Sequence, residues 1–245
     1  MTWHCSFFDC FLSSELGKQE EKKLPPPEWA EKMKGWLNTT KEGLDKNKWV
    51  GDWGCGTGRF SKAWVESGGF AWGADQSKLS LGFLKEKLES MSQEERKRLV
   101  WSHASISERN PQWGNGEKGF EGGFCWNSSI HYSSINEFHA QWRQFQFLIK
   151  KSGYWVIDVP IYEEQNTEPS VIENLDWVIS TRFRRYVRHQ HWRHASGQEY
   201  NTRMRIWPKQ KWRSWLSKTQ TQADWIYHRE ADRPQRLILI CKKNH

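Results

Sequence analysis

The chain has 245 residues, and 37 Lys or Arg against 29 Asp or Glu give it a formal net charge of +8 at pH 7. This length allows one α/β domain with a full core, and no linker divides it, so we expect a single domain over residues 1–245. No apolar run is long enough for a membrane span, which argues against one. The excess of basic residues keeps nucleic acid open as a partner.

The first 27 residues are expected to form a lead-in to the domain and not a signal peptide, because they lack a basic n-region and Asp9 interrupts their apolar stretch. The five cysteines contain no C-x-x-C pair, which indicates neither a zinc site nor a disulfide framework. We therefore expect no metal and a cytoplasmic location.

A glycine-rich turn follows the first apolar strand of the sequence. Residues 49–60 read WVGDWGCGTGRF, in which a short buried strand is followed by a helix that begins near Ser61. Gly54, Gly56 and Gly58 lie between the two elements at alternate positions. Because glycine has no side chain, a flat ligand can approach the backbone closely at the start of such a helix.

Two nucleotide-phosphate motifs do not fit this turn. A P-loop requires Lys and then Ser or Thr after its last glycine, whereas Gly58 is followed by Arg59 and Phe60. The dinucleotide motif is spaced G-x-G-x-x-G, and the spacing here is G-x-G-x-G. The carboxylate of Asp52, two residues ahead of the first glycine, would repel a pyrophosphate and suit a cationic ligand.

The stretch DWGCGTG resembles the first motif of class I S-adenosylmethionine-dependent methyltransferases, which has the form acidic-x-G-x-G-x-G. The resemblance implies S-adenosyl-L-methionine as cofactor, bound in part by Asp52, Gly54, Cys55, Gly56 and Gly58. It also implies an α/β fold, a Rossmann-like three-layer sandwich with a mostly parallel seven-stranded sheet, an antiparallel C-terminal strand and an accessory β-hairpin. Residues 28–160 would form the cofactor-binding half and 161–245 the acceptor-side half. The alternative is a glycine-rich turn that binds no ligand.

The ends of the second and third strands supply further candidate cofactor residues. The run GGFAWGADQS ends in Asp75, which lies 21 residues after Gly54 and is placed to accept hydrogen bonds from ribose hydroxyls. Gln76 follows it and is expected at the same site. In relatives the third strand ends in an acid near the adenine, but this chain has Ala104 there, with Ser105 as a substitute.

Residues 119–160 are typical of a fourth strand, a helix and a fifth strand. Phe138, Trp142 and Phe145 fall near helical spacing, and Gly153 stands where a helix C-cap belongs. The sustained alternation of strand and helix indicates a parallel sheet with helices on both faces.

The loop NSSIHY at residues 127–132 is where the resemblance places groups that contact the acceptor. Asn127 is expected beside the cofactor. His131 is the candidate general base because imidazole titrates near neutrality, and Tyr132 would orient the acceptor. Each has a structural alternative, a backbone hydrogen bond for His131 and simple packing for Tyr132. The loop lacks the two prolines typical of nucleobase and protein-amide N-methyltransferases and is closer to that of small-molecule N-methyltransferases.

The segment 182–207 carries the densest positive charge and predicts a β-hairpin, with strands at 182–192 and 199–207 joined by HASG. A single strand over 182–192 would place Arg184 and Arg188 on the same face, so that neither face is purely basic. We interpret the hairpin as a lid over the acceptor cleft in preference to an RNA-binding strip. A helix and two antiparallel strands are expected after it.

Tryptophan is unusually frequent, with 18 residues scattered along the chain. Several stand where relatives carry an aliphatic residue, including Trp53 and Trp155. Because they do not cluster in sequence, we expect them to pack in the core and on the surface, not to form an aromatic cage.

These features predict an enzyme that transfers a methyl group from S-adenosylmethionine to a small-molecule acceptor, at nitrogen or oxygen. Two alternatives stay open. The positive charge suits an RNA methyltransferase, and Ala104 and Trp53 near the turn suit a noncatalytic descendant of the fold. We expect no membrane partner, and the sequence fixes neither the acceptor nor the oligomeric state.

Overall fold

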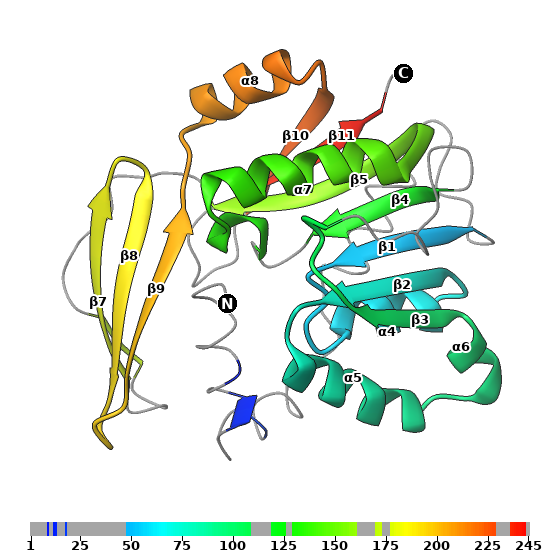
Figure 1. The fold of residues 1–245 in the computed structure, drawn as a ribbon, viewed down its shortest axis with the longest axis horizontal. Coiled ribbons are helices and arrows are strands. Elements are labelled where there is room, and N and C mark those ends of the chain that lie inside the picture. The colour runs from blue at the N-terminus through cyan, green and yellow to red at the C-terminus, as the bar shows by residue number, and fades with distance from the viewer. Residues whose placement is uncertain are drawn as a thin grey trace.

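The protein was analysed as a computed structural model, which contains two β-sheets (Figure 1). It describes residues 9, 12, 13, 18, 48–108, 119–125, 129–160, 170–172, 177–228 and 236–243. In this part of the chain no helix is long and apolar enough to cross a membrane.

Sheet A has seven strands in the order β10-β11-β5-β4-β1-β2-β3. Their bounds are β1 (Trp49–Trp53), β2 (Phe70–Asp75), β3 (Leu99–His103), β4 (Phe120–Cys125), β5 (Ile149–Pro160), β10 (Gln222–His228) and β11 (Arg236–Lys242). Strand β1 pairs in parallel with β2 and β4, β2 pairs in parallel with β3, and β4 pairs in parallel with β5. Strand β11 runs antiparallel to both β5 and β10. The expected mostly parallel sheet with an antiparallel C-terminal strand is confirmed.

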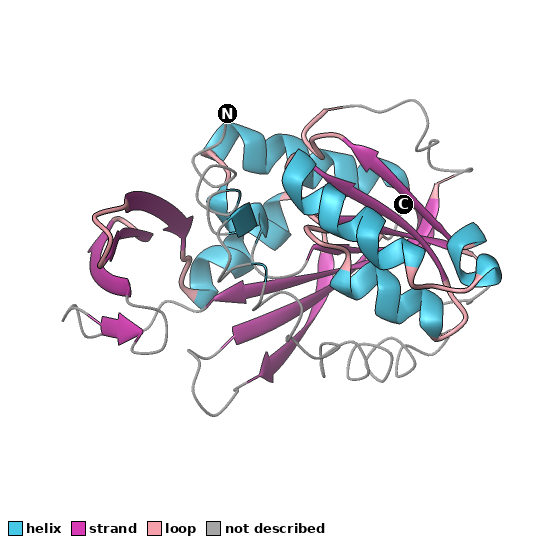
Figure 2. Cartoon of the chain, turned by 90° about the horizontal axis from the view of Figure 1, so that it is seen from below, coloured by secondary structure: helices cyan, strands magenta, loops and turns pink. Residues whose placement is uncertain are grey.

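Helices cover both faces of sheet A, as Figure 1 and Figure 2 show from two sides. They are α4 (Arg59–Glu66), α5 (Lys78–Glu89), α6 (Gln93–Lys97), α7 (Ile135–Leu148) and α8 (Lys209–Lys218), with a short 3-10 helix η2 (Ser129–Tyr132). Helices α7 and α8 share one buried cluster with sheet residues such as Trp155 and Leu239. Helices α4 and α5 share a second cluster with Val50 and Val156. The three layers expected from the alternation are therefore present.

Helix α7 begins with a capping box in which Ser134 Oγ accepts from the backbone of Glu137 and the Glu137 side chain accepts from the backbone of Ser134. The expected C-cap at Gly153 is wrong, because α7 ends at Leu148 and β5 starts at once. Gly153 lies inside β5, where an added Cβ would stand 2.6 Å from the carbonyl oxygen of Glu121. The glycine therefore permits close pairing of β4 and β5 beside a register shift, not the end of a helix.

Sheet B is antiparallel and stands to one side of sheet A (Figure 1). Its strands, in order, are β6 (Ser170–Ile172), β7 (Trp177–Arg184), β8 (Val187–His194) and β9 (Glu199–Arg205). The expected turn at HASG is confirmed between β8 and β9, where the Gly197 amide donates to the carbonyl oxygen of His194 over 2.9 Å. The sheet thus contains the expected hairpin and two further strands.

The single strand expected over residues 182–192 is wrong. A two-residue turn at Arg185 and Tyr186, with φ of 47° and 65°, divides it into β7 and β8. Since Arg184 pairs with Val187 and Phe183 pairs with Arg188, Arg184 and Arg188 lie on opposite faces of the sheet. The assignment of these residues to faces is therefore wrong, although neither face is purely basic, as expected.

The buried tryptophans confirm the expected core packing and depend on glycines beside them. The largest fully buried side chains include Trp53, Trp142, Trp155 and Trp212. An added Cβ at Gly123 would lie 1.9 Å from the Trp53 ring, and one at Gly51 would lie 2.5 Å from it. The indole therefore occupies the space that side chains on its own strand and on β4 would fill.

We predict that Gly123→Ala lowers the free energy of unfolding by about 1–3 kcal/mol, because the new methyl group must displace the Trp53 ring from a closed core. In a Trp53→Leu background the same change should lose most of its effect, since the obstructing ring is gone. Urea unfolding of the four proteins in this cycle measures both values. An equal effect of Gly123→Ala in the two backgrounds would show that the ring does not set the constraint.

Candidate functional site

The glycine-rich turn is fixed to the end of β2 by backbone hydrogen bonds. The amides of Gly54 and Cys55 both donate to the carbonyl oxygen of Ala74, over 2.8 and 3.1 Å. Gly54, Gly56 and Gly58 have φ of 76°, 54° and 74°, a left-handed conformation that costs other residues about 1–2 kcal/mol each. The alternate spacing of the glycines is therefore a backbone requirement of this turn.

The three glycines differ in what surrounds them. A Cβ at Gly58 would lie 2.1 Å from Leu84 of α5, so that glycine permits contact between the turn and a helix. A Cβ at Gly56 would meet nothing within 4 Å. Gly56 therefore borders open space at the carboxyl edge of sheet A, the edge at which ligands bind in open α/β sheets.

Asp75 accepts hydrogen bonds from the backbone of the glycine-rich turn, at the part of the turn that borders open space. One carboxylate oxygen accepts the backbone N–H of Gly56 and the other that of Ser77, each over 2.8 Å. Ser77 in turn caps α5 by accepting the amide of Ser80, and its hydroxyl donates to Asp9. Burial raises the pKa of Asp75, while the hydrogen bonds from Ser77 and Gly56 oppose that rise. The residue expected to bind ribose thus also shapes the turn.

Asp52 accepts hydrogen bonds from the first turn of α4. Its carboxylate is 2% exposed and accepts the hydroxyl of Ser61 over 2.6 Å, with the Ser61 backbone as a second donor. These donors belong to the first turn of the helix, where a bound phosphate would otherwise sit. Burial raises the pKa of Asp52 to about 7, against the lowering effect of the Ser61 hydrogen bonds. The donors of Ser61 that an anionic ligand could use at the start of α4 already bind the Asp52 carboxylate.

The end of β3 joins the same edge. The Ala104 amide donates to the carbonyl oxygen of Asp75 over 3.0 Å, and Gln76 Nε2 donates to Ser105 Oγ over 2.9 Å. His103 Nε2 lies 2.9 Å from the carbonyl oxygen of Gln76. The structure therefore brings together the candidates from the first three strands. Of the expected cofactor residues these are Asp52, Gly54, Cys55, Gly56, Gly58, Asp75, Gln76, Ala104 and Ser105.

The segment after β4 reaches this edge from the other side. His131 and Tyr132 lie in η2. The ring of Tyr132 is half-buried, whereas Asn127 and the side chain of His131 lie outside the described residues. Ser133 Oγ contacts the side-chain amide of Gln141 on α7, which fixes the exit of η2.

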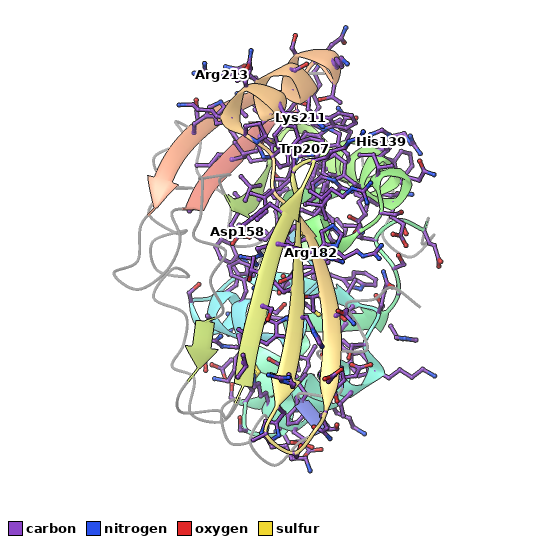
Figure 3. The ribbon with its side chains drawn as sticks, turned by 90° about the vertical axis from the view of Figure 1, so that its left-hand side faces the viewer. His139, Asp158, Arg182, Trp207, Lys211 and Arg213 are labelled. Atoms are coloured by element: carbon purple, nitrogen blue, oxygen red, sulfur yellow. The ribbon has the colours of Figure 1, made fainter. Side chains whose placement is uncertain are left out.

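Arg205 of β9, which the sequence analysis did not single out, connects sheet B to this segment. Its Nη2 donates to the carbonyl oxygen of Ser133 over 2.9 Å, and its guanidinium lies 5.0 and 5.7 Å from the ring centroids of Phe138 and Trp207. Figure 3 labels Trp207 above the strands of sheet B. Burial lowers the pKa of Arg205 to about 10, so the group keeps its charge at neutral pH.

Sequence reasoning also missed Ser61 and Asp9. Ser61 had a signal in principle, because a serine at the start of the predicted helix is placed to meet an acid at the end of the preceding strand. No local sequence pattern marks Asp9, since its contact with Ser77 joins positions 68 residues apart.

Burial raises the pKa of the Cys125 and Cys55 thiols well above the ordinary value. Both stay protonated at neutral pH, so neither serves as a thiolate nucleophile. The chemistry of the site must come from its carboxylates, its backbone amides and the segment after β4.

No protein-family model matches this sequence, and a search of curated proteins found no match. Solved structures of methyltransferases share its fold. An S-adenosylmethionine-dependent methyltransferase from Clostridium acetobutylicum ATCC 824 has a TM-score of 0.72 at 14% identity, covering 99% of each chain.

Two further solved structures have named substrates. The 1,6-didemethyltoxoflavin-N1-methyltransferase of Burkholderia thailandensis has a TM-score of 0.63 at 13% identity, covering 99% of this chain and 89% of that one. CalS10, an amino pentose methyltransferase from Micromonospora echinaspora, has a TM-score of 0.64 at 10% identity, covering 91% and 94%. The similarity confirms the expected fold.

We predict that the free energy of unfolding of the wild type falls relative to that of Asp52→Asn as pH rises from about 4 to about 7. The folded pKa of about 7 lies above the ordinary value of 3.8, so the stabilising contribution is full below 3.8 and is lost up to about pH 7, because the unfolded chain ionises there while the buried group keeps its proton. At about 1.4 kcal/mol per pH unit, the change in unfolding free energy relative to Asp52→Asn approaches about 4 kcal/mol. Urea unfolding at several pH values measures it. Parallel curves for the two proteins would contradict the burial of an ionisable Asp52.

Proposed function

We propose that this chain transfers the methyl group of S-adenosyl-L-methionine to a small-molecule acceptor, at a nitrogen or an oxygen. The observation that carries the proposal is the open space at Gly56, in a left-handed turn whose helix is capped by the protein's own carboxylate. Such a turn rejects a phosphate and accepts the backbone-close approach of a ligand that is neutral or cationic.

S-adenosylmethionine fits this set of residues by charge and by hydrogen bonding. Its sulfonium and ammonium groups are cations, and Asp52 and Asp75 are the acids beside the turn. A cation nearby favours the ionised form of a carboxyl group, so binding would lower the raised pKa of Asp52. Asp75 would accept from the ribose hydroxyls with its remaining lone pairs. We propose that Ala104 and Ser105 border the adenine, at the position where relatives carry an acid.

The cofactor supplies a methyl group on a sulfonium, which is already a good leaving group. The chain must therefore align the acceptor and exclude water, more than it must activate either partner. An amine that arrives deprotonated needs no base, whereas a hydroxyl does. We propose His131 as that base and Tyr132 as a positioning group, which is supported by their position in η2, shortly after the carboxyl end of β4.

A small-molecule acceptor is supported from two sides. The segment 127–132 lacks the paired prolines that suit a planar amide. Two of the solved structures that share the fold are named for methylation of a toxoflavin precursor and an amino pentose. We propose that sheet B covers the acceptor from the β9 side, where Arg205 joins it to the segment that carries His131.

We predict that Gly56→Val abolishes detectable binding of S-adenosylmethionine, because the branched side chain fills the space beside the turn. Gly197→Val is the matched control. Gly197 has φ of 87° and nothing within 4 Å of an added Cβ, but it lies in the β8–β9 turn, away from the site. The control should carry similar backbone strain and bind as the wild type does. Isothermal titration calorimetry measures all three proteins, and ordinary binding by Gly56→Val would refute the site.

A second experiment tests the acceptor class. The protein is incubated with tritium-labelled methyl donor and a cell extract separated into an ultrafiltrate of small molecules, an RNA fraction and a protein fraction. We expect label in the ultrafiltrate, and none there with Gly56→Val as control. Label confined to RNA would replace the small-molecule proposal with an RNA methyltransferase. Donor binding without transfer to any fraction would indicate a noncatalytic descendant of the fold.

A further inference from the structure

The pairing in sheet B sorts its side chains onto two faces. Residues directly opposite each other on neighbouring strands share a face, and alternate residues along a strand change face. One face, here called the basic face, carries Val178, Ser180, Arg182, Arg184, Val187, His189, His191, Arg193, Glu199, Asn201, Arg203 and Arg205. The opposite face carries Ile179, Thr181, Phe183, Arg188, Gln190, Trp192, His194, Tyr200, Thr202 and Met204.

The two faces differ in exposure as they differ in chemistry. On the opposite face Ile179, Thr202 and Met204 are buried, at 6%, 4% and 7% exposure. On the basic face the side chains of Arg182, Arg184, Arg193 and Arg203 are exposed. Four exposed arginines of sheet B therefore lie on the basic face, whereas Arg188 lies on the opposite face and Arg205, at the end of the basic face, is buried. Figure 3 shows its strands side by side, with Arg182 labelled.

One row across three strands places a histidine between two arginines. Arg182 pairs with His189, and His189 pairs with Arg203. The pKa of His189 is lowered by burial and then by the charges of Arg203, Arg182 and Arg184, so all three guanidinium groups act at this point. Arg182 and Arg203 are not directly opposite each other, but their guanidinium groups repel each other across the strand that carries His189. A bound polyanion would turn this repulsion into attraction.

Acidic groups do not offset the row. Among the described residues of the basic face Glu199 is the one carboxylate, and it lies 3.4 Å from His191 in another row. The excess of positive charge is therefore local to this face and is not only a property of the chain, whose net charge is +8.

We propose that the basic face of sheet B binds the sugar-phosphate backbone of double-stranded RNA. Arginine, the only cationic residue type besides histidine on the described part of this face, grips phosphate with two parallel hydrogen bonds. The next row along the strands holds Ser180, His191 and Asn201, which can exchange hydrogen bonds with ribose 2′-hydroxyls. Among the side chains that the structure describes, this face presents no Phe or Trp ring for stacking of single-stranded bases and no apolar side chain larger than valine for insertion into a lipid surface.

This inference goes beyond the proposed function and does not depend on it, because it concerns the face of sheet B and not the glycine-rich turn. RNA held there need not be the methyl acceptor. The two proposals fail in different experiments, one in donor titration and the other in RNA titration.

The test is fluorescence anisotropy with a labelled RNA duplex of about 20 base pairs, titrated at several salt concentrations around about 150 mM. The variant Arg182→Gln/Arg203→Gln should bind at least about 10-fold more weakly, and its plot of log affinity against log salt should be shallower by about two units. The control Lys85→Gln/Lys97→Gln removes the same charge from α5 and α6, which stand apart from sheet B in Figure 1, and should bind as the wild type does.

The substituted arginines are exposed, and their removal relieves like-charge repulsion, so the melting temperature should stay the same or rise. Should the first variant fold poorly, Arg184→Gln/Arg193→Gln removes two charges from the same face and carries the same expectation. Absence of wild-type binding near physiological salt would overturn the proposal, as would an equal loss in the control. Equal affinity for a DNA duplex of the same sequence, or for phosphatidylserine vesicles, would overturn the assignment to RNA.

Discussion

The hydrogen bond between Asp52 and Ser61 is the interaction on which the site depends. It places a buried carboxylate against the first turn of α4, at the end of the central strand β1. The helix terminus is thereby satisfied from within the protein, and the glycine-rich turn beside it is left for a ligand without phosphate. The backbone bonds to Ala74 and the carboxylate of Asp75 then fix the turn to β2. Two acids thus define the charge of the site, and two neighbouring strands define its shape.

The core that carries these strands is assembled in an unusual way. Indole rings fill one side of sheet A, and glycines on adjacent positions make room for them, as Gly51 and Gly123 do for Trp53. The ring centroids of Trp53 and of Phe145 on α7 lie 4.9 Å apart, so the tryptophan directly after Asp52 also packs against a helix. Packing on this side of the sheet and the position of the glycine-rich turn are therefore coupled through β1. The same helix α7 meets Arg205, which joins sheet B to the segment after β4.

Much of this arrangement could be predicted from the sequence because its signals are local. The strand, the three glycines and the helix lie within eighteen residues, Trp49 to Glu66. The three glycines are there because the backbone has positive φ at each of them. Asp75 could be placed because parallel strands end at a common edge. These are short-range rules applied to neighbouring elements.

The errors arose where the structure departs from such rules. The turn at Arg185 and Tyr186 adopts left-handed φ without Gly or Asn, so the sequence contains no typical turn residue there. Because this turn was missed, the residues before it were assigned to the wrong face relative to those after it. Gly153 was assigned to a helix end because glycines favour that position, but here it permits close contact between strands. Contacts such as Asp9 with Ser77 join distant positions and leave no local pattern.

The central claim is that a methyl donor binds at the glycine-rich turn between β1 and α4. Amide hydrogen exchange with and without S-adenosylmethionine, mapped along the chain by mass spectrometry, tests it most directly. The account predicts slower exchange on donor addition in residues 52–58 and 75–77, where the turn and the Asp75 loop lie, and unchanged exchange in β8 and β9. Unchanged exchange throughout 52–58, or protection confined to sheet B, would contradict it.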